Sequence, residues 1–290
     1  MPGWNEIVTR VETNLETVAK ECLSALKNHT NRNVIVYFSA WQQKKNIPGA
    51  LYGIDDNDLN GFMNSIRGMD KQIGLDLVLH TPGGEIGAAQ KIVEYLKNVF
   101  SNNFRVFVPH SAMSAGTMIA CASSVVYMGR HSFLGPIDPQ INGIPTNEFK
   151  NTIQRMKDDL NNNRNVAYWI QYMQQLPPQL EGVVENVIEH SKQLVKEWLS
   201  DNMLNGDALG VDRTVEYLSN YSLHREHNNC LNITHLRSHT DLNIIALEDD
   251  EVLQDLVLSV YHAFQILVGR TSIAKIITNH DFEKFVVNHG

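Results

Sequence analysis

Two stretches of this 290-residue chain constrain its fold most, because each is an apolar run that ends abruptly in small residues. Residues 75–79 (LDLVL) lead into HTPGG, and residues 105–109 (RVFVP) lead into HSAMSAGT. A helical pattern follows each run, over residues 86–100 and 117–123. Strand-length apolar runs that alternate with helices predict an α/β fold with a parallel sheet and crossover helices. Sites in such sheets lie at the carboxyl ends of the strands.

The residues that follow these two strands suit nucleophilic catalysis by a serine. Ser114 stands among Ala and Gly, which leave room for a substrate carbonyl to approach. A serine nucleophile also needs backbone N–H groups that point at the developing oxyanion. The Gly83-Gly84 pair tolerates the backbone angles that such a donor requires. The N–H of Ala115, at the start of the expected helix, is a second candidate donor.

The segments HTPGGEIGAAQKI and VPHSAMSAGTMIACASSVVYMGRHSFLGPIDPQ together resemble the serine dehydrogenase proteinase family. Members of that family have the Clp/crotonase fold and are related to signal peptide peptidase A and to the Clp proteolytic subunit. The resemblance is strong over residues 75–140 and weaker through EWLSDNML and LEDDEVLQDLVLSVYHAF. It implies a serine peptidase with Ser114 as nucleophile and with Gly83 or Gly84 and Ala115 forming the oxyanion hole.

The general base is less well defined than the nucleophile. Clp-type enzymes use a histidine and an acid, but no histidine stands at residues 137–138, where motif order would put it. The sequence therefore favours the lysine base of signal-peptide-peptidase types, with Lys150, Lys157 and Lys192 as candidates and His190 as a weaker one. Lys157 has the more usual spacing, and Lys192 lies in the most apolar helix. A catalytic lysine must be desolvated so that its pKa falls toward neutrality.

The chain divides into three expected parts. A helix is expected within residues 1–32, a Clp/crotonase-like domain over 33–219, and an extension with a strand and a helix over 220–290. Residues 143–200 form a polar, helix-rich insertion in the domain. The resemblance implies that this insertion is the handle that builds an oligomer and overhangs the site, and its surplus apolar surface fits that role.

Composition restricts the partners of the protein. The net charge of −8 and the absence of a basic stripe argue against nucleic-acid binding. Three widely spaced cysteines indicate a reducing compartment. Because no apolar run approaches 18 residues and no signal pattern opens the chain, we expect a soluble, cytoplasmic protein.

The acids Asp55, Asp56 and Asp58 are expected in a capping, solvated turn, and the histidines of residues 224–239 fit no standard zinc spacing.

The sequence therefore predicts a cytoplasmic, homo-oligomeric serine endopeptidase that needs no metal or organic cofactor. Its substrates would be peptides or unfolded protein segments, bound as an extended strand beside residues 83–86. Two alternatives stay open: an inactive Clp-fold scaffold that only binds peptide, and a crotonase-type acyl-CoA enzyme whose Gly and Ala N–H groups hold a thioester. Control by a partner ATPase or regulator also stays open.

Overall fold

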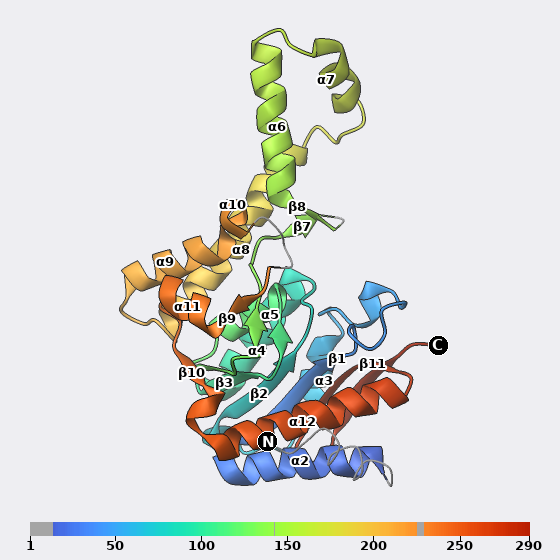
Figure 1. Ribbon diagram of the computed structural model, residues 1–290, viewed down its shortest axis with the longest axis vertical. Coiled ribbons are helices and arrows are strands. Elements are labelled where there is room, and N and C mark those ends of the chain that lie inside the picture. Colours follow the sequence, from blue (N-terminus) through green and yellow to red (C-terminus); the bar gives the residue numbers. More distant parts are fainter. Residues whose placement is uncertain (1–13, 142, 225–228) are drawn as a thin grey trace.

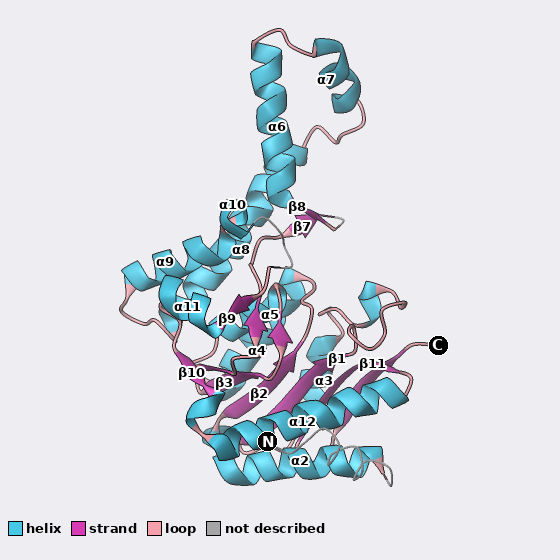
Figure 2. Ribbon diagram, viewed as in Figure 1, coloured by secondary structure: helices cyan, strands magenta, loops and turns pink. Residues whose placement is uncertain are grey.

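A seven-stranded sheet forms the centre of the computed structural model, which describes residues 14–141, 143–224 and 229–290 (Figures 1 and 2). Its strand order is β10-β5-β3-β2-β1-β11-β12, and the first five of these run parallel. The strands are β1 (Asn33–Ser39), β2 (Leu75–His80), β3 (Phe104–Val108), β5 (Val126–Met128), β10 (Ile244–Ala246), β11 (Ile273–Asn279) and β12 (Lys284–Asn288). The expected α/β fold with a parallel-rich sheet and crossover helices is confirmed.

Helices cover both faces of this sheet, so the central strands are buried throughout. Side chains alternate between faces along a strand. Val34, Val36 and Phe38 of β1 therefore pack in one apolar cluster with α2 (Leu15–Thr30) and α12 (Glu251–Arg270). Ile35 and Tyr37 pack in the other cluster, with α3 (Asp58–Ile66), α4 (Ile86–Phe100) and α5 (Ala115–Cys121).

α12 is the one helix of the described residues that is long and apolar enough to span a membrane. In this structure it lies against α2 and the sheet (Figure 1). Of its most apolar 18-residue segment, 61% is buried. Packing on the sheet accounts for its apolar composition.

The C-terminal segment adds two strands beside β1 that the sequence analysis did not predict. β11 pairs antiparallel with β1, with Tyr37 opposite Ile277, and β12 pairs antiparallel with β11. The run IAKIITN has the length and the β-branched content of a buried strand, so a local signal was present. The segment after residue 220 thus supplies three strands of the same sheet.

The insertion projects from the body as a helical arm (Figure 1). It begins with the hairpin β7 (Gln140–Ile141) and β8 (Ile144–Pro145) and continues through α6 (Thr146–Asn161), α7 (Val166–Met173) and α8 (Leu180–Asp201). The three helices expected in the insertion are therefore present. The C-terminal part of α8 returns to the core, where Val195 and Leu199 are fully buried.

Shorter elements complete the chain. The three-stranded sheet β4-β6-β9 stands beside the main one. Its strands and the remaining helices are β4 (Ser111–Ala112), β6 (Phe133–Leu134), α9 (Ala208–Ser219), α10 (Tyr221–His224), β9 (Leu231–Asn232) and α11 (Ile233–His239), with 3-10 turns at Gly49–Leu51, Lys71–Ile73 and Leu247–Asp249.

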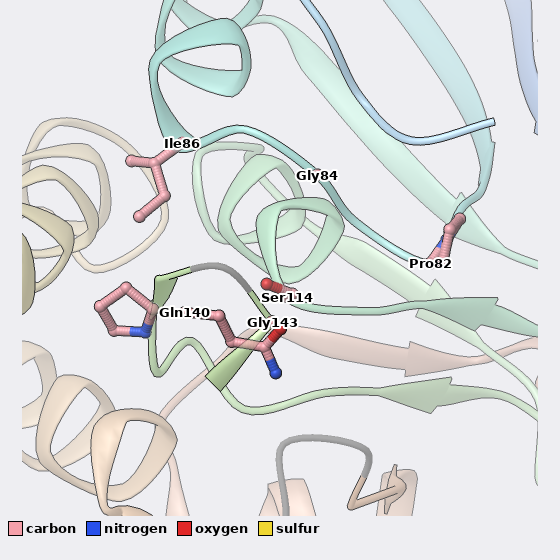
Figure 3. Close-up of a pocket in the computed structure, with 7 residues that line it drawn as sticks. Pro82, Gly84, Ile86, Ser114, Gln140 and Gly143 are labelled. Atoms are coloured by element: carbon pink, nitrogen blue, oxygen red, sulfur yellow. The ribbon is translucent and has the colours of Figure 1, made fainter. Parts of the chain in front are cut away.

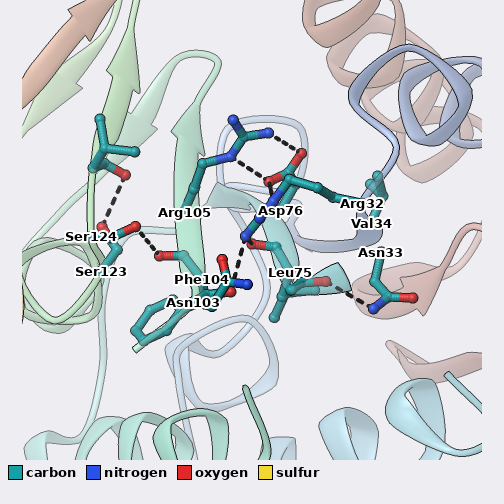
Figure 4. A network of polar contacts seen from close by, with 12 residues as sticks. Arg32, Asn33, Val34, Leu75, Asp76, Asn103, Phe104, Arg105, Ser123 and Ser124 are labelled. Atoms are coloured by element: carbon teal, nitrogen blue, oxygen red, sulfur yellow. Dashed lines mark hydrogen bonds and ion pairs between the residues drawn. The ribbon is translucent and has the colours of Figure 1, made fainter. Parts of the chain in front are cut away.

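A buried ion cluster ties three parts of the chain together near the start of β2 and β3 (Figure 4). The fully buried Asp76 carboxylate accepts hydrogen bonds from Arg32 Nε at 2.8 Å and from Arg105 Nε and Nη2, each at 2.7 Å. Breaking such a pair leaves an uncompensated buried charge. The cluster lies at the amino-terminal end of β2, whereas the Gly83-Gly84 turn follows its carboxyl end.

We expect the Asp76→Asn variant to be less stable than the wild type by about 3 kcal/mol, the low end of the range for broken buried pairs, because both guanidinium groups keep some access to water. Urea unfolding measures this loss. Lys91→Ala breaks the exposed pair with Asp56 and should leave the unfolding midpoint nearly unchanged. Equal midpoint shifts for the two variants would contradict the prediction.

Candidate active site

Ser114 stands on a tight turn between a strand and a helix. β4 ends at Ala112 and α5 begins at Ala115. The Ser114 backbone has φ 51° and ψ −115°, a conformation that costs strain for any residue with a Cβ. Its hydroxyl makes no capping hydrogen bond to α5. Strained strand-to-helix turns of this kind expose the nucleophilic serine of α/β hydrolases, so the local geometry suits the role that the sequence predicts for Ser114.

Hydrogen bonds between neighbouring loops hold the Ser114 turn in place. The Thr81 N–H donates to Ser111 O, and the Met113 N–H donates to Thr81 O, both at 3.0 Å. The Thr117 hydroxyl accepts a hydrogen bond from the Gly135 N–H at 2.9 Å. These hydrogen bonds connect the segments that follow β2, β3 and β6 to one another next to Ser114.

Gly83 allows the turn after β2 to approach the turn that carries Ser114. Its φ is +97°, in the region that favours glycine. A Cβ at this position would lie 2.7 Å from Met113 O and 2.8 Å from Ser114 Cβ. Its N–H donates to the Thr81 hydroxyl at 3.1 Å. Gly83 therefore shapes the turn, while its own N–H already has an acceptor.

Gly84 differs from Gly83 in the direction of its N–H. Residue Ile54 forms a parallel bridge with Gly84: its N–H donates to Gly83 O and its carbonyl accepts from the Glu85 N–H, both at 2.9 Å. In such a bridge the central residue's own N–H points away from the partner strand. A Cβ on Gly84 would collide with the Ile54 backbone. The Gly84 N–H is therefore directed away from Ile54 and takes no part in this bridge.

A cavity of about 500 Å³ opens in front of Ser114 (Figure 3). Its lining combines the turn after β2, the serine and the hairpin at the base of the insertion. The lining residues are Pro82, Gly84, Ile86, Ser114, Pro139, Gln140 and Gly143. Gly84 and Ser114 thus share the cavity, whereas Ala115 is fully buried behind it at the start of α5.

The candidate bases lie elsewhere. Lys150, Lys157, Lys192 and His190 are absent from the described lining of the Ser114 cavity. Lys157 lies half exposed on α6, where it forms an ion pair and a hydrogen bond with Glu181. The hydrogen bond raises the pKa of Lys157. A general base needs the opposite change. Lys192 lies on α8 with its Nζ 3.9 Å from Glu216 Oε2. Among the described residues, none of these four side chains forms a hydrogen bond with Ser114 or lines its cavity.

His80, the last residue of β2, is buried in an aromatic cluster behind the turns. Its ring centroid lies 4.6 Å from that of Phe38, 4.2 Å from Trp41 and 5.2 Å from Tyr261. No side chain of the described residues hydrogen-bonds its ring nitrogens, and the Ser111 backbone only partly offsets the effect of burial on the ring. Burial, and secondarily the nearby His110, hold the pKa of His80 well below its usual value.

We expect His80→Phe to reduce the acid sensitivity of the fold. Because the pKa of His80 is lower in the folded chain, the unfolded chain binds more protons below about pH 6.5, and stability falls as the pH drops from there. Between pH 7.5 and pH 5 the variant should therefore lose at least about 1 kcal/mol less stability than the wild type. Urea unfolding at the two pH values measures the difference, and equal losses would contradict the prediction.

Two features near the site differ from or go beyond the sequence prediction. Asp58, expected in a solvated turn, is fully buried and ion-paired with Lys275 of β11, so that part of the expectation is wrong. The contact of Ile54 with Gly84 carried no local signal, since a bridge between distant backbone segments does not depend on residue type. Among the described residues no cluster of His, Cys, Asp or Glu could hold a metal ion.

The α/β fold and the serine turn beside a glycine turn agree with the class of protein that the sequence resemblance implies, a Clp-like serine proteinase. The sequence matches the model of the ClpP-like SDH-type serine proteinase family over residues 9–221. This match covers well over half of the chain, and the protein belongs to that family. The expected family is therefore confirmed.

Individual relatives match over shorter segments. Two uncharacterized proteins of Methanocaldococcus jannaschii are similar: MJ0137 is 32% identical over 151 residues, and MJ1495 is 36% identical over 88 residues. The matched segments cover 50% of this chain and 51% of MJ0137, and 30% of each chain for MJ1495. A solved structure, that of a mutant of the 1510-N membrane-bound stomatin-specific protease, aligns with 70% of this chain and 79% of its own, with 16% identity and a TM-score of 0.41.

Proposed function

We propose that this protein is a serine endopeptidase that cleaves extended peptides or unfolded protein segments. The observation that carries the proposal is the strained Ser114 turn, which faces a cavity lined by Gly84 (Figure 3). Ser114 Oγ attacks the scissile carbonyl, and its proton passes to a general base. The N–H groups of Gly84 and Ala115 stabilise the tetrahedral oxyanion.

The assignment of Gly84 as donor, with Gly83 in a shaping role, follows from their hydrogen bonds. Gly83 donates to Thr81, whereas the bridge to Ile54 directs the Gly84 N–H to the other side. Ala115 supplies the first N–H of α5, which has no intrahelical acceptor. Two donors from two turns suit a carbonyl that enters between them.

The base in this proposal is a lysine of the insertion, Lys157 or Lys192. Both side chains lie on the arm formed by α6–α8, outside the cavity of their own chain. The arm carries exposed apolar side chains, among them Tyr168 and Ile170, which favour contact with a second copy. In a homo-oligomer a lysine on this arm can reach the Ser114 of a neighbouring subunit.

A fluorophosphonate probe tests the nucleophile directly, because it reacts with an activated serine and leaves a covalent adduct. We expect one adduct, located by peptide mass on the segment that contains Ser114. A folded, assembled protein that takes no adduct would contradict the proposal and favour the scaffold. Thermal stabilisation by coenzyme A without an adduct would favour the acyl-CoA enzyme.

Mixing variants tests the base. Lys157→Met and Lys192→Met are each purified and then mixed with Ser114→Ala protein under conditions that exchange subunits. Recovery of peptidase activity in one mixture would identify that lysine as a base acting between subunits. Full activity of both lysine variants alone would exclude the lysine base and leave the nucleophile assignment intact.

A further inference from the structure

A second buried ion cluster lies behind the Gly83-Gly84 turn, and none of its residues belongs to the described lining of the cavity. Lys275 of β11 is fully buried, with its Nζ 2.6 Å from Asp58 Oδ1 and 2.9 Å from Asp55 Oδ2. It also donates to Gly53 O at 2.7 Å. The Tyr37 hydroxyl donates to Asp58 Oδ2 at 2.8 Å. Because a buried charge is costly unless it is paired, these contacts define one position for each group.

The cluster holds the backbone on both sides of Ile54. Lys275 binds the carbonyl of Gly53 and the side chain of Asp55, and the Asp55 N–H donates to Asp58 Oδ2 at 3.0 Å. Ile54 lies between these two anchored residues, and its backbone groups are those that pair with Gly83 and Glu85. A continuous set of contacts therefore runs from β11 to the Gly84 turn.

Gly84 has little freedom to move independently of Ile54. Even a Cβ on Gly84 would collide with the Ile54 N and O atoms, so the two backbones are in direct contact. A shift of Ile54 must therefore reorient the peptide that carries the Gly84 N–H. Oxyanion donors act only when they are held at the right place before the reaction.

We propose that Lys275, Asp58 and Asp55 form a positioning cluster that sets the orientation of the Gly84 N–H. As a statement about catalysis, this inference rests on the proposed serine peptidase function. Lys275 lies outside residues 9–221, the segment that matches the family model. In this proposal, a strand from outside that segment takes part in building the site. The cluster acts through Ile54 and contacts neither substrate nor reacting atoms.

The chain offers a matched control for this proposal. Asp76 is also fully buried and ion-paired on a central strand (Figure 4). It lies at the start of β2, whereas the Gly84 turn follows the end of β2. Lys275→Met and Asp76→Asn both break a buried ion cluster. Only the first removes a group that anchors Ile54.

Two readouts are measured on each variant in its folded, assembled form. The first is amide hydrogen exchange at Ile54 and Glu85, which donate the two bridge hydrogen bonds; we expect exchange at least about tenfold faster in Lys275→Met. The second is turnover of an unfolded polypeptide. We expect kcat to fall about 10- to 100-fold with KM nearly unchanged, because the cavity lining is untouched. Asp76→Asn should change neither.

If Lys275→Met does not fold, Tyr37→Phe takes its place in the test, because it removes only one hydrogen bond to Asp58. It should shift both readouts in the same direction by a smaller factor. Unchanged exchange at Ile54 and Glu85 in a folded Lys275→Met or Tyr37→Phe protein would overturn the inference. Equal effects of Asp76→Asn would also overturn it, because general destabilisation would then suffice. If the wild type shows no turnover but exchange at Ile54 and Glu85 is faster in Lys275→Met and unchanged in Asp76→Asn, the proposed function is refuted. The positioning contact is then retained.

Discussion

Ser114→Ala is expected to abolish fluorophosphonate labelling and to lower the rate of peptide cleavage by roughly 10⁵- to 10⁶-fold, the size of effect seen when a serine nucleophile is removed. The change deletes one oxygen from a residue that is only partly buried, so the fold should be kept. The strained backbone belongs to the turn, and alanine meets the same strain as serine. Steady-state cleavage of an unfolded polypeptide, together with labelling, measures the loss.

A serine at the far end of the same fold provides the control for this variant. Ser124 donates to Phe104 O at 3.0 Å, at the amino-terminal end of β3. Ser124→Ala removes the same hydroxyl group away from the cavity and should retain labelling and turnover. An adduct that persists in Ser114→Ala would show that another nucleophile reacts, and Ser114 would lose its assigned role.

Gly83→Ala is expected to lower turnover about 100-fold or more, although residue 83 donates no hydrogen bond to the substrate in the proposed mechanism. The added Cβ would meet Met113 O and Ser114 Cβ, and the positive φ is unfavourable for alanine. One of the two turns must therefore move, and displacements of about 1 Å at a reacting group cost on the order of 10²-fold in rate. Fluorophosphonate labelling rates and kcat report this displacement.

Gly87→Ala is the matched control, four residues further along the same chain segment. A Cβ there has no neighbour within 4 Å, and residue 87 lies in the first turn of α4. Alanine should keep the rate and raise stability by up to about 1 kcal/mol through helix propensity. Wild-type turnover in Gly83→Ala would mean that the close approach of the two turns does not control the reaction.

The sequence alone was sufficient to predict the two turns that the structure brings together at the candidate site. The apolar runs of β2 and β3 have strand length, and each is followed by residues small enough for close backbone approach, so Gly83, Gly84 and Ser114 could be identified from local patterns. The same holds for the three helices of the insertion, whose apolar residues recur at helical spacing. These features depend on neighbours in the chain, which any reader of the sequence can see.

The tertiary structure decided how those turns are held and which groups they use. The two adjacent glycines differ because Gly83 meets Thr81 whereas Gly84 meets Ile54, and no local pattern separates them. Lys275 reaches Asp55 across 220 positions of sequence, and the candidate lysines of the insertion lie away from the cavity of their own chain. Such contacts arise from the pairing of distant strands and the direction of a projecting arm, where the geometry of the assembled sheet, and not the residue types, determines which groups meet.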